Sequence, residues 1–238
     1  AKAIAGFMIA IPSASAVGSP ISTYLLELNL FGLEGWQTLF ILEAIPSLIL
    51  GVACFYYLTD SIEEANWLEA DEREWLKNIV AEEQAAKAKK KKVSFLTALK
   101  ERDVLILALG YFAWICGYYG IVMFLPTLVH GLSSTIATTT IGWIIGLMYL
   151  LAAFVMYAVG RHSDKVNERR YHVAGCLVVA AVGLVASVYI AQSNVIASLI
   201  VFAVALSGAY GAYSPFWAIP PAYLSGSAAA AGIALINS

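Results

Sequence analysis

The chain has 238 residues, of which 61% are hydrophobic and only 13% are charged, whereas an ordinary soluble domain has about 45–50% apolar and about 25% charged residues. This composition excludes a soluble enzyme and a nucleic-acid-binding domain, and it predicts helices surrounded by lipid. The formal net charge of −2 hides a segregation, because the 14 Lys and Arg residues lie in a few blocks. Such blocks indicate membrane topology rather than a charged partner.

Two apolar runs, 4–28 and 36–58, open the chain, and each is long enough to cross a bilayer, which takes about 20 residues. Glu43 lies inside the second run, and Pro46 follows it. An ionisable side chain at membrane depth is costly and is therefore a functional candidate. Glu43 is accordingly a candidate for proton coupling, and the alternative is a structural carboxyl that hydrogen-bonds to neighbouring helices.

A long polar stretch, 59–103, comes next. Within it, four apolar residues recur at helical spacing among charged ones: Trp75, Leu76, Ile79 and Val80. This spacing predicts an amphipathic helix that lies along the membrane surface. The basic block 87–92 follows, and it either attracts anionic headgroups or is a solvated linker that helps to fix orientation.

Further spans follow the polar stretch, at 104–129, 141–159, 173–191 and 195–219, and another apolar run begins near Ala228. None of the runs shows the sustained alternation of a β-barrel strand, so the expected fold class is an all-α integral membrane bundle.

The first of these later spans contains two adjacent tyrosines, Tyr118 and Tyr119, with Gly117 and Gly120 on either side. This pattern favours a locally bent helix whose phenols turn inward to bind substrate. The alternative is an aromatic packing cluster.

The last complete span carries polar and small residues on one helical face: Ser207, Tyr210, Gly211, Ser214 and Trp217. Hydroxyls and an indole gain nothing from lipid, so this face should point into the bundle. It either lines a substrate site or packs closely against another helix.

The basic residues predict the sidedness of the chain. If the spans cross alternately, all 14 Lys and Arg fall on one side, whereas the connections 29–35, 130–139 and 192–194 contain none. The positive-inside rule assigns the basic side, including the stretch 59–103, to the cytoplasm.

The stretch GRHSDKVNERR at 160–170 resembles the cytoplasmic signature of the major facilitator superfamily. Five other stretches resemble its anion:cation symporter family: AIPSASAVGSPIS at 10–22, GWQTLFILEAIPSLILG at 35–51, YYLTDSIEEANWL at 56–68, GYYGIVMFLPTLV at 117–129 and SPFWAIPPAYLSGSAAAAGIALINS at 214–238. The resemblance covers nearly the whole chain.

This resemblance implies a fold and a domain organisation. The chain would be an internal fragment of the major facilitator fold, covering helices five to ten and the start of helix eleven. Residues 1–58 would be the last two helices of the N-terminal six-helix half, 59–103 the central cytoplasmic loop, and 104–238 an incomplete C-terminal half.

The resemblance also implies secondary active transport in the inner membrane: proton-coupled uptake of a small organic anion, such as tartrate, phthalate, a sugar acid or hydroxyphenylacetate, by alternating access. Such a protein is a monomer in lipid that catalyses no reaction and needs no cofactor, metal or nucleic acid. The apolar runs contain no Lys or Arg, so the charge partner of an anion lies elsewhere. The alternatives are a facilitator or exporter of a neutral or aromatic compound and a non-transporting membrane receptor.

Site residues follow from the same resemblance. Ser214, Trp217 and Asn237 would line the substrate cavity, with Tyr210, Tyr118 and Tyr119 as further candidates. The signature residues are Gly160, Arg161, Asp164, Arg169 and Arg170. Asp164 would couple the two halves in one conformation, and the arginines would pair with it or act as topology anchors.

Overall fold

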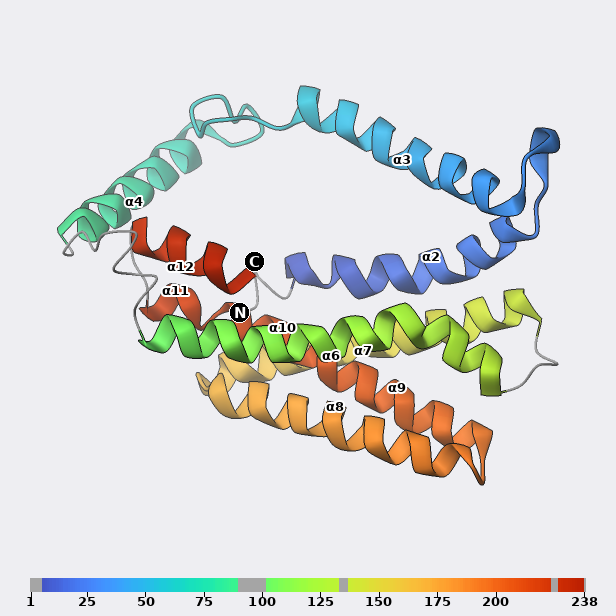
Figure 1. Ribbon diagram of the computed structural model, residues 1–238. Coiled ribbons are helices and arrows are strands. Elements are labelled where there is room, and N and C mark those ends of the chain that lie inside the picture. The colour runs from blue at the N-terminus through green and yellow to red at the C-terminus, as the bar shows by residue number, and fades with distance from the viewer. Residues whose placement is uncertain (1–5, 90–101, 133–136, 224–226, 238) are drawn as a thin grey trace.

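The computed structural model describes residues 6–89, 102–132, 137–223 and 227–237 (Figure 1). Over these ranges the regular elements are helical, and six spans are long and apolar enough to cross a membrane, as the sequence predicts. They comprise α2 (Ala10–Leu26), α3 (Gly35–Tyr57), α6 (Arg102–Leu132), α7 (Thr138–Val166), α8 (Arg170–Ala191) and α9 (Val195–Gly211) with its continuation α10 (Tyr213–Trp217).

The helix α7 lies at the centre of the bundle, with α2 against one side and α9 against another, while α8 and α9 pack along each other (Figure 1). Small residues permit these close contacts. A Cβ on Gly146 of α7 would lie 2.7 Å from the carbonyl oxygen of Ala16 on α2, and one on Gly208 of α9 would lie 2.7 Å from the carbonyl oxygen of Cys176 on α8. Helices in lipid associate through such small-residue contacts.

The predicted helix in the polar stretch is α4 (Ala70–Lys89). The Arg73 guanidinium fixes its start, because it donates to the carbonyl oxygens of Ala65 and Leu68 at 3.0 and 3.2 Å. Lys77 pairs with Glu63 at 3.0 Å. Of the basic block, 90–92 lies outside the described residues.

The last complete span is interrupted at Ala212, where the sequence suggests one continuous helix. The helix α9 ends at Gly211, α10 runs from Tyr213 to Trp217, and the short helix α11 (Pro220–Tyr223) follows. Pro215 has no backbone N–H, so the carbonyl of Gly211 loses its partner four residues on. The apolar run predicted near Ala228 is α12 (Ser227–Asn237), which packs against α6.

Candidate functional site

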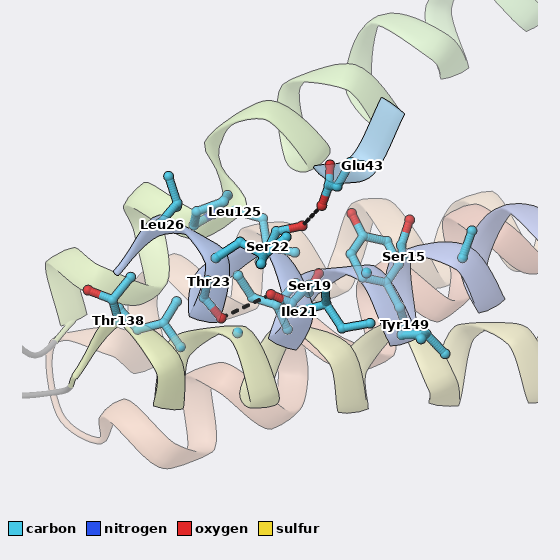
Figure 2. Close-up of a pocket in the computed structure, with 18 of the residues that line it drawn as sticks. Ser15, Ser19, Ile21, Ser22, Thr23, Leu26, Glu43, Leu125, Thr138 and Tyr149 are labelled. Atoms are coloured by element: carbon cyan, nitrogen blue, oxygen red, sulfur yellow. Dashed lines mark hydrogen bonds between the residues drawn. The ribbon is translucent and has the colours of Figure 1, made fainter. Parts of the chain in front are cut away.

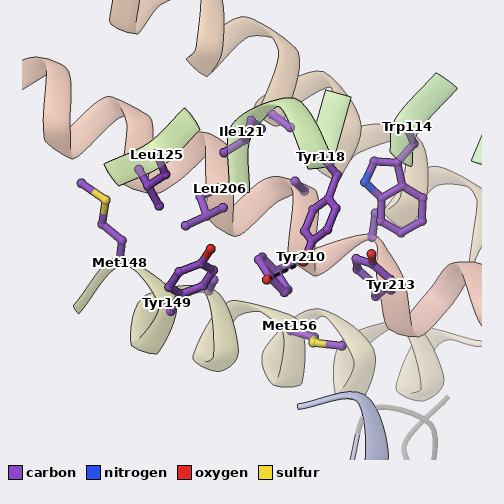
Figure 3. Close-up of a cluster of buried hydrophobic side chains, with 14 of the residues drawn as sticks. Trp114, Tyr118, Ile121, Leu125, Met148, Tyr149, Met156, Leu206, Tyr210 and Tyr213 are labelled. Atoms are coloured by element: carbon purple, nitrogen blue, oxygen red, sulfur yellow. Dashed lines mark hydrogen bonds between the residues drawn. The ribbon is translucent and has the colours of Figure 1, made fainter. Parts of the chain in front are cut away.

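Four tyrosines from four helices meet inside the bundle: Tyr118 of α6, Tyr149 of α7, Tyr210 of α9 and Tyr213 of α10 (Figure 3). The hydroxyls of Tyr118 and Tyr210 lie 2.7 Å apart and form a buried hydrogen bond. The rings of Tyr149 and Tyr213 lie 5.8 and 5.9 Å from that of Tyr210. The structure therefore brings together two sequence-predicted residues, Tyr118 and Tyr210, and adds two that the sequence analysis missed. We call these four residues the tyrosine cluster.

Trp114 extends the tyrosine cluster along α6 (Figure 3). Its ring lies 4.5 Å from that of Tyr213 and 5.5 Å from that of Phe216. The side chain is only 7% exposed, and its indole Nε1 has no hydrogen-bond acceptor among the described residues. A buried donor without a partner normally costs about 1–3 kcal/mol, so Trp114 marks a place where an acceptor is missing.

Tyr111 connects the two substrate-binding candidates Trp217 and Asn237. Its ring lies 5.2 Å from that of Trp217 and stacks on Phe216 at the same centroid distance. Its hydroxyl lies 3.5 Å from Oδ1 of Asn237 on α12. Tyr111 was not predicted, although Tyr111, Trp114 and Tyr118 follow i, i+3, i+7 spacing and so share one face of α6.

The other predicted residues are placed differently. Ser214 is fully buried on α10. Ser207 is buried on α9, where its hydroxyl donates to the carbonyl oxygen of Ala203 at 2.7 Å. Tyr119 is 54% exposed, and its ring touches that of Tyr118 at a centroid distance of 5.5 Å. Tyr119 therefore lies at the margin of the tyrosine cluster.

A second site is a cavity of about 1350 Å³ between α2, α3, α6 and α7 (Figure 2). Its polar lining includes Ser15, Ser19, Ser22, Glu43 and Thr138. The hydroxyl of Ser22 donates to Oε1 of Glu43. The carboxyl predicted at membrane depth thus faces a cavity and is hydrogen-bonded to the neighbouring helix.

The signature stretch forms the turn between α7 and α8. Gly160, Arg161 and Asp164 lie on the last turns of α7, and Arg170 begins α8. The Asp164 carboxylate lies 3.6 Å from the Arg169 guanidinium. Asn167 ends α7 in the left-handed conformation, with φ of 51°, which Asn adopts at lower cost than most residues.

Glu168, which the sequence analysis did not single out, caps α8. Its carboxylate accepts the backbone N–H groups of Tyr171 and His172 at 2.8 and 3.3 Å, and it contacts Nδ1 of His172 at 2.7 Å. Desolvation opposes the charged form, but these N–H donors outweigh it and hold the pKa of Glu168 below its usual value.

Chemically, the face around Tyr111, Trp114 and the tyrosine cluster offers phenol O–H groups, an indole N–H and aromatic surfaces. The described spans carry Lys or Arg only near their ends. Within the described part of the chain, no group of three His, Cys, Asp or Glu residues is arranged to hold a metal ion. The site can orient a small molecule by hydrogen bonds and ring contacts, but it holds no cation to neutralise a charged one.

The chain matches the sequence profile of the Major Facilitator Superfamily over residues 1–238. It is 42% identical over 98% of its length to a putative tartrate transporter of Agrobacterium vitis, covering 53% of that protein. It is 34% identical over 98% of its length to the putative metabolite transport protein NicT of Pseudomonas putida, covering 53%, and 29% identical over its whole length to a quinolone resistance transporter of Acinetobacter baumannii, covering 54%. The chain thus spans about half the length of these relatives.

Proposed function

This chain belongs to the major facilitator superfamily, and we propose that the protein containing it takes up a small organic anion across the inner membrane by alternating access. In this proposal, residues 1–58 and 104–238 belong to the two halves of a monomeric transporter. The stretch 59–103 joins them on the cytoplasmic side.

One observation carries the proposal: aromatic and hydroxyl groups are gathered inside the bundle where α6, α9 and α10 meet. Tyr118 bonds to Tyr210 at 2.7 Å, and Ser214 and Trp217 follow on the same chain segment. Polar groups inside a membrane bundle are costly unless they serve a pathway or a contact. We assign Ser214, Trp217, Asn237 and the two tyrosines to the substrate-binding wall.

The charge of the substrate is the second element of the proposal. Tartrate is the substrate in the names of two relatives, and it is a dicarboxylate with two hydroxyls. The donors of this chain suit carboxylate and hydroxyl oxygens. Because the described spans hold no cation away from their ends, the neutralising charge would come from the rest of the transporter.

Glu43 is the candidate for proton coupling. Within the described spans it is the carboxyl that lies away from a helix end, and it faces the cavity between α2, α3, α6 and α7. The Ser22 hydroxyl donates to it, so this hydrogen bond joins α2 to α3. Protonation would remove the charge and weaken this bond between α2 and α3, so Glu43→Gln should uncouple uptake from the pH gradient. A purely structural Glu43 would leave coupling intact.

Asp164 is the candidate latch between conformations. It pairs with Arg169 in the turn between α7 and α8, on the side that the basic residues assign to the cytoplasm. Asp164→Asn should leave expression intact, slow uptake and shift the balance between inward-facing and outward-facing states. The shift is measured by the distance between spin labels at Tyr57→Cys and Asn167→Cys. Unchanged uptake and unchanged distances would reduce the motif to a topology anchor.

A facilitator or exporter of an aromatic compound is the second candidate. The rings of Trp114, Tyr111, Phe216 and Trp217 lie within 4.5–5.7 Å of one another or of Tyr213, an arrangement that suits a flat ligand. One relative is named a quinolone resistance transporter.

Uptake by the full-length protein in proteoliposomes separates the candidates. Radiolabelled tartrate should accumulate when the outside is more acidic and should only equilibrate when the gradient is collapsed. Accumulation that does not depend on the pH gradient would show that uptake is not coupled to protons. No tartrate uptake, together with export of a fluorescent quinolone, would favour the second candidate.

A further inference from the structure

Tyr111 lies between two of the proposed substrate-binding groups without being one of them. Its ring contacts Trp217 at 5.2 Å, and its hydroxyl lies 3.5 Å from Oδ1 of Asn237. These two residues come from α10 and α12, which are separate segments, and both pack against α6 at this point. Tyr111 is half-buried, so a ligand at Trp217 and Asn237 would lie beside it.

The contact between Tyr111 and Asn237 has a consequence for the amide. An asparagine side chain has one oxygen that accepts and one nitrogen that donates twice, and the two ends exchange places when the amide turns over. When the Tyr111 O–H donates to Oδ1, the oxygen end is held toward α6. The two N–H groups of Asn237 are then the part left to meet a ligand.

Trp114 is a second group here that needs a hydrogen-bond acceptor. It lies on the same face of α6, three residues after Tyr111, and its buried indole N–H has no acceptor among the described residues. With one lone pair of the Asn237 oxygen taken by Tyr111, the Asn237 amide N–H groups and the Trp114 indole N–H can only donate. A ligand rich in acceptor oxygens would complement these donors, whereas a ligand that offers N–H groups at the same place would set donor against donor.

We propose that Tyr111 is a positioning residue that orients the Asn237 amide so that its N–H groups face the substrate and select a carboxylate over the corresponding amide. This inference rests on the proposed function, because it takes Asn237 as a substrate-binding residue. Tyr111 sets selectivity through Asn237 and does not itself supply the selecting groups.

A double-mutant cycle in the full-length protein tests the inference, with the dissociation constants of tartrate and of tartaric diamide measured in nanodiscs. Tyr111→Phe removes the hydroxyl and keeps the ring. It should weaken tartrate binding about 3- to 10-fold, as expected for one hydrogen bond, and it should narrow the discrimination against the diamide. Asn237→Ala should weaken tartrate binding by a similar factor, and the double variant should be no weaker than Asn237→Ala alone.

Tyr171→Phe is the matched control, because Tyr171 is 82% exposed at the start of α8 and loses the same hydroxyl. It should change neither affinity nor discrimination. If the double variant weakens tartrate binding by the product of the two single factors, the residues act independently and the inference is overturned. The same conclusion follows if Tyr111→Phe lowers the melting temperature but leaves both affinities unchanged. If the wild-type protein binds no tartrate, both the proposed function and the inference are rejected. If the wild type binds tartrate and Tyr111→Phe has the same dissociation constants, only the inference is rejected.

Discussion

Glu168 illustrates how one side chain sets a local structure. The free N–H groups at the start of a helix favour a carboxylate, and Glu168 supplies one to the first turn of α8. Its pKa is held below the usual 4.5. A carboxyl with a lowered pKa stabilises the fold above its unfolded pKa, and this contribution is lost as the pH falls through the lowered value.

The stability of a Glu168→Gln variant should therefore depend on pH differently from wild type. At pH 7 the variant should unfold at a lower temperature than wild type. The gap should close as the pH falls from about 4.5 through the lowered pKa of Glu168, because the folded wild-type side chain then becomes neutral as well. Thermal unfolding in detergent between pH 3 and 7 measures the gap. Glu74→Gln, on an exposed part of α4, is the control, and a Glu168→Gln gap that stays constant with pH would contradict the capping role.

Residue spacing predicts which side chains share a helix face, but not which face lies opposite. The spacing of Ser207, Tyr210 and Ser214 was sufficient to place them inside the bundle, where the structure has them. Tyr111, Trp114 and Tyr213 escaped prediction because their importance comes from partners on other helices. Those pairings depend on how α6 and α10 pack, which no local pattern encodes.

At the scale of elements, the contact between α2 and α7 depends on glycines of α7. The Ala16 carbonyl oxygen sits 2.7 Å from where a Gly146 Cβ would be, and the Ser19 carbonyl oxygen lies 2.8 Å from where a Gly142 Cβ would be. Backbone oxygens cannot rotate away as a side chain can. An added methyl group therefore forces the two helices apart.

Gly146→Ala should destabilise the protein by about 1–3 kcal/mol, the usual cost of overpacking. Gly175→Ala on α8 is the matched control, because nothing lies within 4 Å of its added Cβ. That change should be neutral or stabilise the helix by up to about 1 kcal/mol. Unfolding in detergent measures the change in the free energy of unfolding of each variant. A Gly146→Ala variant as stable as wild type would show that α2 and α7 are not in close contact.

The element boundaries were only partly predictable. The lengths of the apolar runs were sufficient to find all six described spans. They did not reveal that α7 continues to Val166 through the signature, or that the last span breaks after Gly211. Both features depend on backbone hydrogen bonds, namely the cap at Asn167 and the N–H that Pro215 lacks, rather than on hydropathy.

At the scale of the whole molecule, the distribution of basic residues predicts a topology. The turn that contains Arg169 and Arg170 should face the cytoplasm, whereas the turn at Gln192 should face outward. In the full-length protein, with its native cysteines replaced, Gln192→Cys should react with an impermeant thiol reagent in intact cells. Asn167→Cys should react only after the cells are opened. Labelling of Asn167→Cys from outside would reject this topology.

The arrangement of the helices in the bundle did not follow from the sequence. In lipid, hydrophobicity does not select one helix pair over another, so packing depends on matching small residues and polar contacts. Gly142 and Gly146 lie at such a contact, and only the structure identifies α2 as their partner. The same holds for α12, whose contact with α6 brings Asn237 to Tyr111.

The central claim is that α10 and α12 line the path of a small organic anion, and substrate protection tests it most directly. In the full-length protein without native cysteines, Trp217→Cys and Asn237→Cys are treated with a thiol reagent with and without saturating tartrate. Gln192→Cys, in an exposed turn, is the control. Tartrate should slow the reaction at 217 and 237 and leave 192 unaffected, whereas unchanged rates at both positions would contradict the account.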